Sequence, residues 1–214
     1  MAITRIITPG VTDDAVTSDK LNDNIISGTT ALTSQPADTD EFLVSDAGTL
    51  KRIDYSLIKG GGITMADQWR VSANVTLTDP EAYVTSNWER NDNTGYGGIG
   101  TGMTESSGVF SFPSTGIYLI EVYGSFYQNS GASNNNGLFP YTTINNSSYN
   151  IQTGNLSSGE ANYDHNAASS AFLFDVTDTS NCKVKFSQYG ENGLLRGSTS
   201  QNRTHVTFIR LGDT

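Results

Sequence analysis

The two histidines of the chain, His165 and His205, are the residues best suited to acid–base chemistry. His165 follows Asp164 in a polar stretch, residues 159–167, that is typical of a solvent-exposed loop. His205 alternates with apolar residues in a predicted strand near the C-terminus, which favours contact with a neighbouring side chain over catalysis. Neither histidine is accompanied by a cysteine or a serine motif, so a catalytic triad is not predicted. We therefore expect no catalytic residues and predict that the chain is not an enzyme.

Metal and cofactor sites are not predicted either. Asp92, Glu89 and Glu105 offer the oxygen ligands that calcium prefers, but their spacing matches no calcium-binding loop, and we expect surface carboxylates. Cys182 is the only cysteine, which excludes internal disulfides and paired-cysteine zinc sites, and we expect it to be a small strand residue. Residues 95–102 are rich in glycine, but no strand-to-helix transition with Lys-Ser/Thr follows them. This segment predicts a mobile loop without a phosphate ligand.

Four tyrosines in polar segments rich in Asn and Ser could instead recognise a partner. A tyrosine offers a ring for stacking and a hydroxyl for hydrogen bonding, which suits carbohydrate or protein ligands. The alternative is that Tyr141 and Tyr149 only complete strands. The candidate contact residues are Tyr96, Tyr141, Tyr149 and Tyr163.

Charge and hydropathy exclude two classes of partner. The formal net charge is −10 and Lys and Arg do not cluster, so we expect no nucleic-acid binding. No apolar run approaches the roughly 18 residues that span a bilayer, so we expect no membrane insertion. The N-terminus lacks the apolar core of a signal peptide, which predicts synthesis in a cytoplasm without export.

A long strand is predicted from Gly116 to Gln128, because β-branched and aromatic residues dominate this segment. Side chains alternate between the two faces of a strand, so the segment presents two sets. One set is Tyr118, Ile120, Val122, Gly124 and Phe126, and the other is Ile117, Leu119, Glu121, Tyr123, Ser125 and Tyr127. Both sets are largely apolar, and no amphipathic helix lies nearby to cover the second one. The strand therefore predicts a sandwich that associates with further copies of itself.

From residue 63 onward, apolar runs alternate with turn-rich segments, which is typical of an all-β sandwich. The candidate strands are residues 67–75, 82–90, 108–112, 116–128, 137–145, 170–176, 183–189 and 203–211. Eight such strands predict a jelly roll. In the last strand, Ile209 and Leu211 lie on the face opposite to the core. The side chains expected in the core include Phe172, Phe174, Val176, Val184, Phe186, Val206 and Phe208.

A smaller unit precedes the sandwich. Residues 40–53 contain two short apolar runs around Asp-Ala-Gly, which predicts a β-hairpin, and Asp54 is placed to cap a helical turn after it. Residues 17–21 could begin another helical turn. So small a unit buries too little area to be stable alone, and we expect it and residues 1–27 to be ordered by a partner.

Three consecutive glycines then predict a flexible joint. The predicted organisation is an N-terminal attachment segment at residues 1–59, a linker at residues 60–62 and a jelly-roll knob at residues 63–214.

Residues 108–123, which read Gly-Val-Phe-Ser-Phe-Pro-Ser-Thr-Gly-Ile-Tyr-Leu-Ile-Glu-Val-Tyr, resemble the signature of the tumour-necrosis-factor and complement globular-head superfamily. Residues 88–102 and 203–212 are similar to that family too. The resemblance implies a ten-stranded jelly roll that forms a homotrimer through its inner sheet. This sequence has neither a collagen-like stalk nor the closing Ser-Gly-Phe-Leu pattern, so an animal signalling role is not favoured. The expected trimer-interface residues are Ile117, Leu119, Glu121, Tyr123, Ile209 and Leu211.

Glu121 is the charged residue of this expected interface. Carboxylates that meet unpaired near a three-fold axis would repel one another, whereas an arginine from Arg203 or Arg210 would compensate them. Buried charges are usually satisfied, so pairing is the favoured expectation.

Residues 40–56 resemble a hairpin that recurs in tail-fibre and other virion proteins of bacteriophages, particularly aquatic ones. The resemblance implies a virion protein whose N-terminal segment binds other virion proteins and whose trimeric knob, a tail fibre or adhesin, contacts a glycan or protein of the host surface. A capsid decoration or head-fibre protein without a receptor role is the alternative, followed by a secreted binding module and a glycan-degrading enzyme. The expected attachment residues are Phe42, Val44, Leu50 and Ile53.

Overall fold

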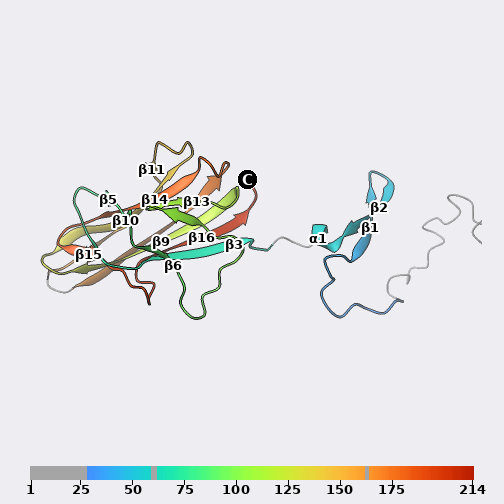
Figure 1. Ribbon diagram of the computed structural model, residues 1–214, viewed down its shortest axis with the longest axis horizontal. Helices are drawn as coiled ribbons and strands as arrows, with labels where there is room; N and C mark the ends of the chain where they lie inside the picture. The colour runs from blue at the N-terminus through green and yellow to red at the C-terminus, as the bar shows by residue number, and fades with distance from the viewer. Residues whose placement is uncertain (1–27, 59–61, 162–163) are drawn as a thin grey trace, which may run out of the picture. The chain divides into compact units, whose positions relative to one another are not determined.

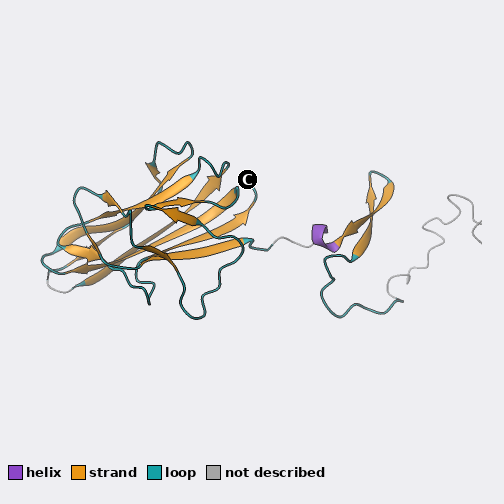
Figure 2. Cartoon of the chain, viewed as in Figure 1, coloured by secondary structure: helices purple, strands orange, loops and turns teal. Residues whose placement is uncertain are grey.

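The computed structural model describes residues 28–58, 62–161 and 164–214, which belong to two compact units divided between Gly60 and Gly61 (Figure 1). Residues 1–27, with the helical turn expected near residues 17–21, lie outside the described residues, as does Tyr163. Strands make up most of the larger unit, whereas the small unit holds one two-stranded hairpin and a single turn of helix (Figure 2).

The small unit is built on the predicted hairpin. Strands β1 (Glu41–Asp46) and β2 (Thr49–Asp54) pair antiparallel, with Phe42 opposite Ile53. Ala47 and Gly48 both have positive φ, 49° and 86°, as a two-residue hairpin turn with the twist of its strands requires. The predicted helical turn is α1 (Tyr55–Ile58).

The knob is a sandwich of two antiparallel seven-stranded sheets, here called the β9 sheet and the β14 sheet after a strand in each that pairs with three others. The β9 sheet contains β3 (Met65–Val71), β4 (Val75–Thr76), β6 (Trp88–Arg90), β9 (Gly116–Gln128), β13 (His165–Val176), β15 (Gly193–Leu195) and β16 (His205–Gly212). The β14 sheet contains β5 (Ala82–Tyr83), β7 (Thr104–Ser106), β8 (Val109–Ser111), β10 (Ser133–Thr143), β11 (Asn150–Ile151), β12 (Leu156–Gly159) and β14 (Lys183–Tyr189).

Strand β9 has the bounds that the sequence predicts and organises its sheet. One edge pairs with β13 over the whole length of both strands. The other edge pairs first with β16 and then with β15. Both edges of β9 are therefore hydrogen-bonded, and only its two faces remain for packing.

The core lies between the sheets, and the predicted inward set of β9 belongs to it. Tyr118 is fully buried, and its hydroxyl donates to the Ser114 carbonyl at 2.9 Å. Phe110 meets Phe186 edge to face at 5.6 Å, the geometry that aromatic pairs prefer. The other predicted core residues are confirmed, with Phe172 only partly buried: Phe174, Val176, Val184, Phe186, Val206 and Phe208.

Several predicted boundaries were wrong. The expected strand 82–90 is two strands in different sheets, because the chain crosses from the β14 sheet to the β9 sheet past Asn87, whose φ is 66°. The polar segments that begin at Ser133, His165 and Gly193 are strands rather than turns or loops. Their backbone groups pair with neighbouring strands, and such pairing leaves no hydrophobic pattern in the sequence.

Candidate functional site

The outward face of the β9 sheet, called the open face below, carries the second set of β9 side chains. Leu119 lies opposite Leu173 of β13 on one side and opposite Ile209 of β16 on the other, which forms an apolar row across three strands. Leu173 is 64% exposed, and Leu119 and Ile209 are half-buried. Leu211 is exposed where the register between β16 and β9 shifts, so it lies beside this row but outside the regular pairing. Ile117 begins the face next to it.

The middle of the open face holds Glu121, Tyr123 and His205 around a hollow of about 330 Å³. The imidazole of His205 stacks on the ring of Tyr123, with centroids 5.2 Å apart, and its Nδ1 lies 3.0 Å from the Asn202 carbonyl oxygen. Burial lowers the pKa of His205, because the charged imidazolium loses water there.

Within one protomer, neither Arg203 nor Arg210 forms the expected ion pair with Glu121. Arg210 instead donates to the Thr115 carbonyl at 2.8 Å and to Asp213, at the end of its strand. Arg203 donates to the Gln201 side chain at 2.9 Å. Glu121 is exposed and makes no ion pair with any described residue.

The far end of the open face is cationic. Arg196, Arg203, His165, Tyr127 and Asn74 line a second hollow of about 290 Å³. His165 rests against Tyr127 with ring centroids 4.8 Å apart, so its ring forms one wall of this hollow.

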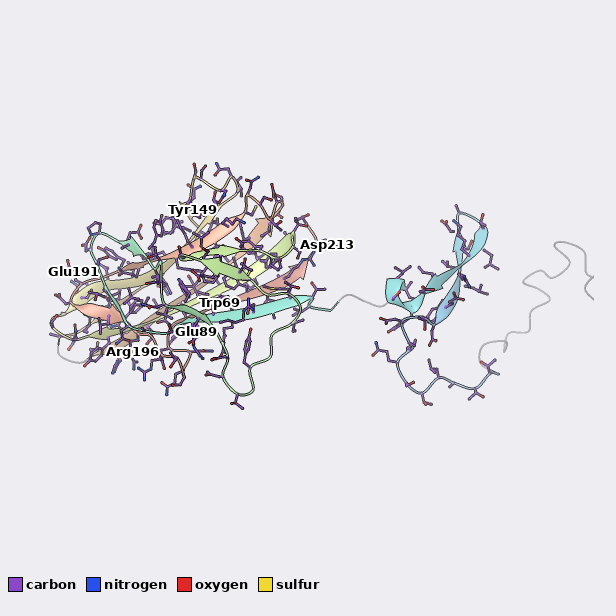
Figure 3. All side chains as sticks on the ribbon, viewed as in Figure 1. Trp69, Glu89, Tyr149, Glu191, Arg196 and Asp213 are labelled. Carbon is purple, nitrogen blue, oxygen red and sulfur yellow. The ribbon has the colours of Figure 1, made fainter. Side chains whose placement is uncertain are left out.

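The predicted contact residues Tyr141 and Tyr149 lie around Tyr83 and Lys185 on the outward face of the β14 sheet, with the rings of Tyr141 and Tyr83 edge to face at 5.5 Å. The ammonium group of Lys185 lies 3.5 Å from the ring centroid of Tyr83 and 3.9 Å from that of Tyr149. The hydroxyl of Tyr141 donates to Glu81, and burial together with this carboxylate raises the pKa of Tyr141 to about 12. We call Glu81, Tyr83, Tyr141, Tyr149 and Lys185 the tyrosine cluster. This cluster and the cationic end of the open face lie on opposite sides of the knob, as the positions of Tyr149 and Arg196 show (Figure 3).

Tyr96 has a structural role and does not join the tyrosine cluster. Its hydroxyl donates to Asp67 at 2.9 Å and accepts from the Gln68 amide, and burial raises its pKa. The backbones of Ile99 and Ala66 exchange two hydrogen bonds. The glycine-rich segment expected to be mobile is thus attached to β3.

Two buried charges that the sequence analysis missed hold this region together. Asp67 accepts hydrogen bonds from Trp69 Nε1 at 2.9 Å and from Met103 N at 2.8 Å. Arg70 is completely buried and pairs with Glu89 at 2.9 Å and with Asp92. The sequence feature that could have indicated these buried charges is the presence of Asp67 and Arg70 in one predicted strand that also contains Trp69.

The three carboxylates that offered oxygen ligands for calcium each bind another group of the protein. Glu89 and Asp92 bind Arg70, and Glu105 accepts from the Gly108 amide at 2.6 Å. Among the described residues, no three His, Cys, Asp or Glu side chains gather in a way that could hold a metal ion.

The hairpin exposes most of its apolar side chains. Phe42, Val44 and Ile53 share one face, because Phe42 and Ile53 are opposite each other and Val44 is two residues along. Leu50 lies opposite Ser45 and falls on the other face with Leu43. The four predicted attachment residues therefore occupy both faces of the hairpin.

Solved structures resemble the knob in fold. The crystal structure of murine APRIL at pH 5.0 matches with a TM-score of 0.50 and 16% identity, over 69% of this chain and 98% of that chain. The structure of Eiger TNF from S. frugiperda matches with a TM-score of 0.50 and 14% identity, over 72% of this chain and 96% of that chain. The knob is thus a jelly roll of the tumour-necrosis-factor type, as the resemblance implied.

The sequence itself gives no such match. No protein-family model and no curated protein matches it. Within the part of the chain that the structure describes, no helix is long and apolar enough to cross a membrane.

Proposed function

We propose that the chain is a structural protein of a bacteriophage, a trimeric tail fibre or adhesin that is attached to the virion by its small unit and contacts the host surface with its knob. The observation that carries this proposal is the layout of two units that each leave apolar side chains uncovered in a single protomer. The hairpin's resemblance to virion proteins supports the identity of the particle.

Self-association through the open face accounts for the apolar row. Leu119, Leu173 and Ile209 come from three adjacent strands, so together they form an apolar surface that faces solvent in the isolated protomer. Exposed apolar patches of this kind mark interaction surfaces, and symmetric copies of one chain are the commonest partners. A trimer would bury the row of each protomer against its neighbours.

Attachment to the virion follows from the size of the hairpin unit. Among the described aromatic residues, the ring of Phe42 contacts only that of Tyr55, and the two centroids are 6.1 Å apart. Leu43, 77% exposed, and Leu50 stand on the opposite face. A two-stranded hairpin is marginal in water, so its apolar faces are suited to burial in another virion protein.

Host contact is assigned to the tyrosine cluster. Tyr83 keeps part of its ring exposed, and Glu81 and Lys185 supply opposite charges next to the rings. Rings with nearby polar groups are suited to stack on a sugar and to hydrogen-bond its hydroxyls.

Attachment is tested by the substitution Phe42→Asp in particles that carry the protein. The buried charge should abolish incorporation, because Phe42 and Val44 form the apolar face that is proposed to dock. Ile144→Asp, on an exposed loop of the knob, is the matched control and should be incorporated normally. Immunoblots of purified particles measure both variants, and normal amounts of Phe42→Asp would refute attachment through the hairpin.

Adhesion is tested separately with purified protein on host cells. Wild type should bind and Tyr149→Ala should bind roughly five- to 150-fold more weakly, the effect of losing about 1 to 3 kcal/mol, which is what a ring contributes when it stacks on a nucleic-acid base. If particles carry the protein but wild type does not bind cells, the decoration or head-fibre function replaces the adhesin.

A further inference from the structure

Arg196 and Arg203 differ from the other arginines that the structure describes. Arg52 pairs with Glu41, Arg70 with Glu89 and Asp92, Arg90 with Asp67, and Arg210 with Asp213. Arg196 and Arg203 form no ion pair with any described carboxylate, although the protein carries 22 Asp and Glu residues. In so acidic a chain, two unpaired guanidinium groups in one hollow need a specific reason.

The chain holds the two cations close together. Arg196 follows β15, and its amide donates to the Ser125 carbonyl at 2.8 Å, so it continues the pairing of β15 with β9. Arg203 precedes β16, whose His205 pairs with Tyr123 of β9. Burial, and then the charge of Arg203, lower the pKa of Arg196, which shows that the charges repel each other.

The remaining walls of the hollow present hydrogen-bond donors. Asn74 uses its carbonyl oxygen to accept from the Gly197 amide at 2.9 Å, which leaves its NH₂ group as a donor. His165 supplies a ring nitrogen, and its ring rests against that of Tyr127. Among the described residues, no carboxylate lines the hollow. A site that combines two guanidinium groups with neutral donors is complementary to an oxygen anion, which arginine binds through two parallel hydrogen bonds.

We propose that Arg196 and Arg203 form a binding site for an oxyanionic group, a phosphate, sulfate or carboxylate, that a molecule outside the protomer supplies. The anion removes the repulsion between the two guanidinium groups and takes up hydrogen bonds that they otherwise give to water. It comes either from a free ligand or from a carboxylate of a second copy of the chain. The site does not depend on the protein's place in a virion.

Binding is measured by calorimetric titration of the full-length protein with sodium phosphate at constant ionic strength. Wild type should bind, and Arg196→Gln and Arg203→Gln should each bind at least tenfold more weakly, since each variant loses charge-assisted hydrogen bonds to the anion. Arg196→Lys should fall between wild type and Arg196→Gln, because lysine keeps the charge without the planar pair of donors. Arg52→Gln, an exposed arginine of the small unit, is the control and should bind like wild type.

Sedimentation with and without phosphate identifies the source of the anion. If a second copy supplies it, phosphate dissociates the wild-type assembly and the Arg196→Gln/Arg203→Gln double variant is already dissociated. If a free ligand supplies it, assembly is unchanged and only the titration depends on the arginines. The proposal is overturned if the double variant equals Arg52→Gln in both phosphate affinity and assembly. Thermal unfolding confirms that the double variant is folded.

Discussion

At the scale of single residues, His205 shows how burial on the open face couples charge to stability. Its imidazole stacks on Tyr123 and is half-buried, and burial lowers its pKa below the ordinary value of 6.5. The unfolded chain then binds a proton more readily than the folded chain, so protonation favours unfolding.

His205 should therefore make the protein less stable in mild acid. As the pH falls through about 6.5 towards the folded-state pKa, the free energy of unfolding should decrease, and this decrease should be smaller in His205→Gln. Urea unfolding of both proteins at pH 8 and pH 5.5 measures the difference. An equal pH dependence in the two proteins would show that His205 is as well hydrated when folded as when unfolded.

Tyr118 is the residue-scale test of the two faces of β9. Tyr118→Ala should cost about 3 to 5 kcal/mol, because it leaves a cavity in the core. Tyr118→Phe keeps the ring and loses only the hydrogen bonds of its hydroxyl to the Ser114 carbonyl and to the Ser114 hydroxyl, so it should cost about 1 kcal/mol. Urea denaturation measures both, and wild-type stability in the alanine variant would mean that the face was assigned in reverse.

At the scale of elements, the buried carboxylate of Asp67 in β3 binds the segment between β6 and β7 through hydrogen bonds and an ion pair. Asp67 accepts the Trp69 indole and the Met103 amide and lies 3.2 Å from Arg90. The packing of β3 alone would leave this segment attached by few backbone hydrogen bonds, so the buried carboxylate fixes its path.

Asp67→Asn should destabilise the knob by about 3 kcal/mol, since a neutral amide weakens several charge-assisted hydrogen bonds and leaves Arg90 without its carboxylate. Asp175→Asn, at an exposed position of β13, is the matched control and should change stability by less than about 0.5 kcal/mol. Urea unfolding compares them, and hydrogen exchange at the Met103 amide reports the local effect. Equal stability of the two variants would contradict a structural role for Asp67.

At the scale of the whole molecule, the open face is the proposed contact between protomers. Leu173 is 64% exposed, so an aspartate there should leave the fold intact while placing a charge in the apolar row. Leu173→Asp should convert a trimer into monomers, whereas Ile144→Asp, at a position 70% exposed outside the open face, should remain trimeric. Sedimentation velocity measures the mass of both variants, and a trimeric Leu173→Asp would place the contact elsewhere.

The amino-acid sequence was sufficient for the features that local pattern encodes. The composition and alternation of residues 116–128 predicted β9 and its buried face, because successive side chains of a strand point to opposite faces of the sheet. The Asp-Ala-Gly turn predicted the hairpin, since only certain residues adopt positive φ at low cost. The signature in residues 108–123 indicated the jelly roll.

Tertiary structure decided which residues meet. Arg196 and Arg203 come from segments that are unrelated in sequence, and only the pairing of β15 and β16 with the same strand brings them into one hollow. The polar start of β13 at His165 and the partners of Arg70 were likewise set by strands distant along the chain. Backbone pairing and charge compensation depend on neighbours in space, and these leave no periodic pattern in the sequence.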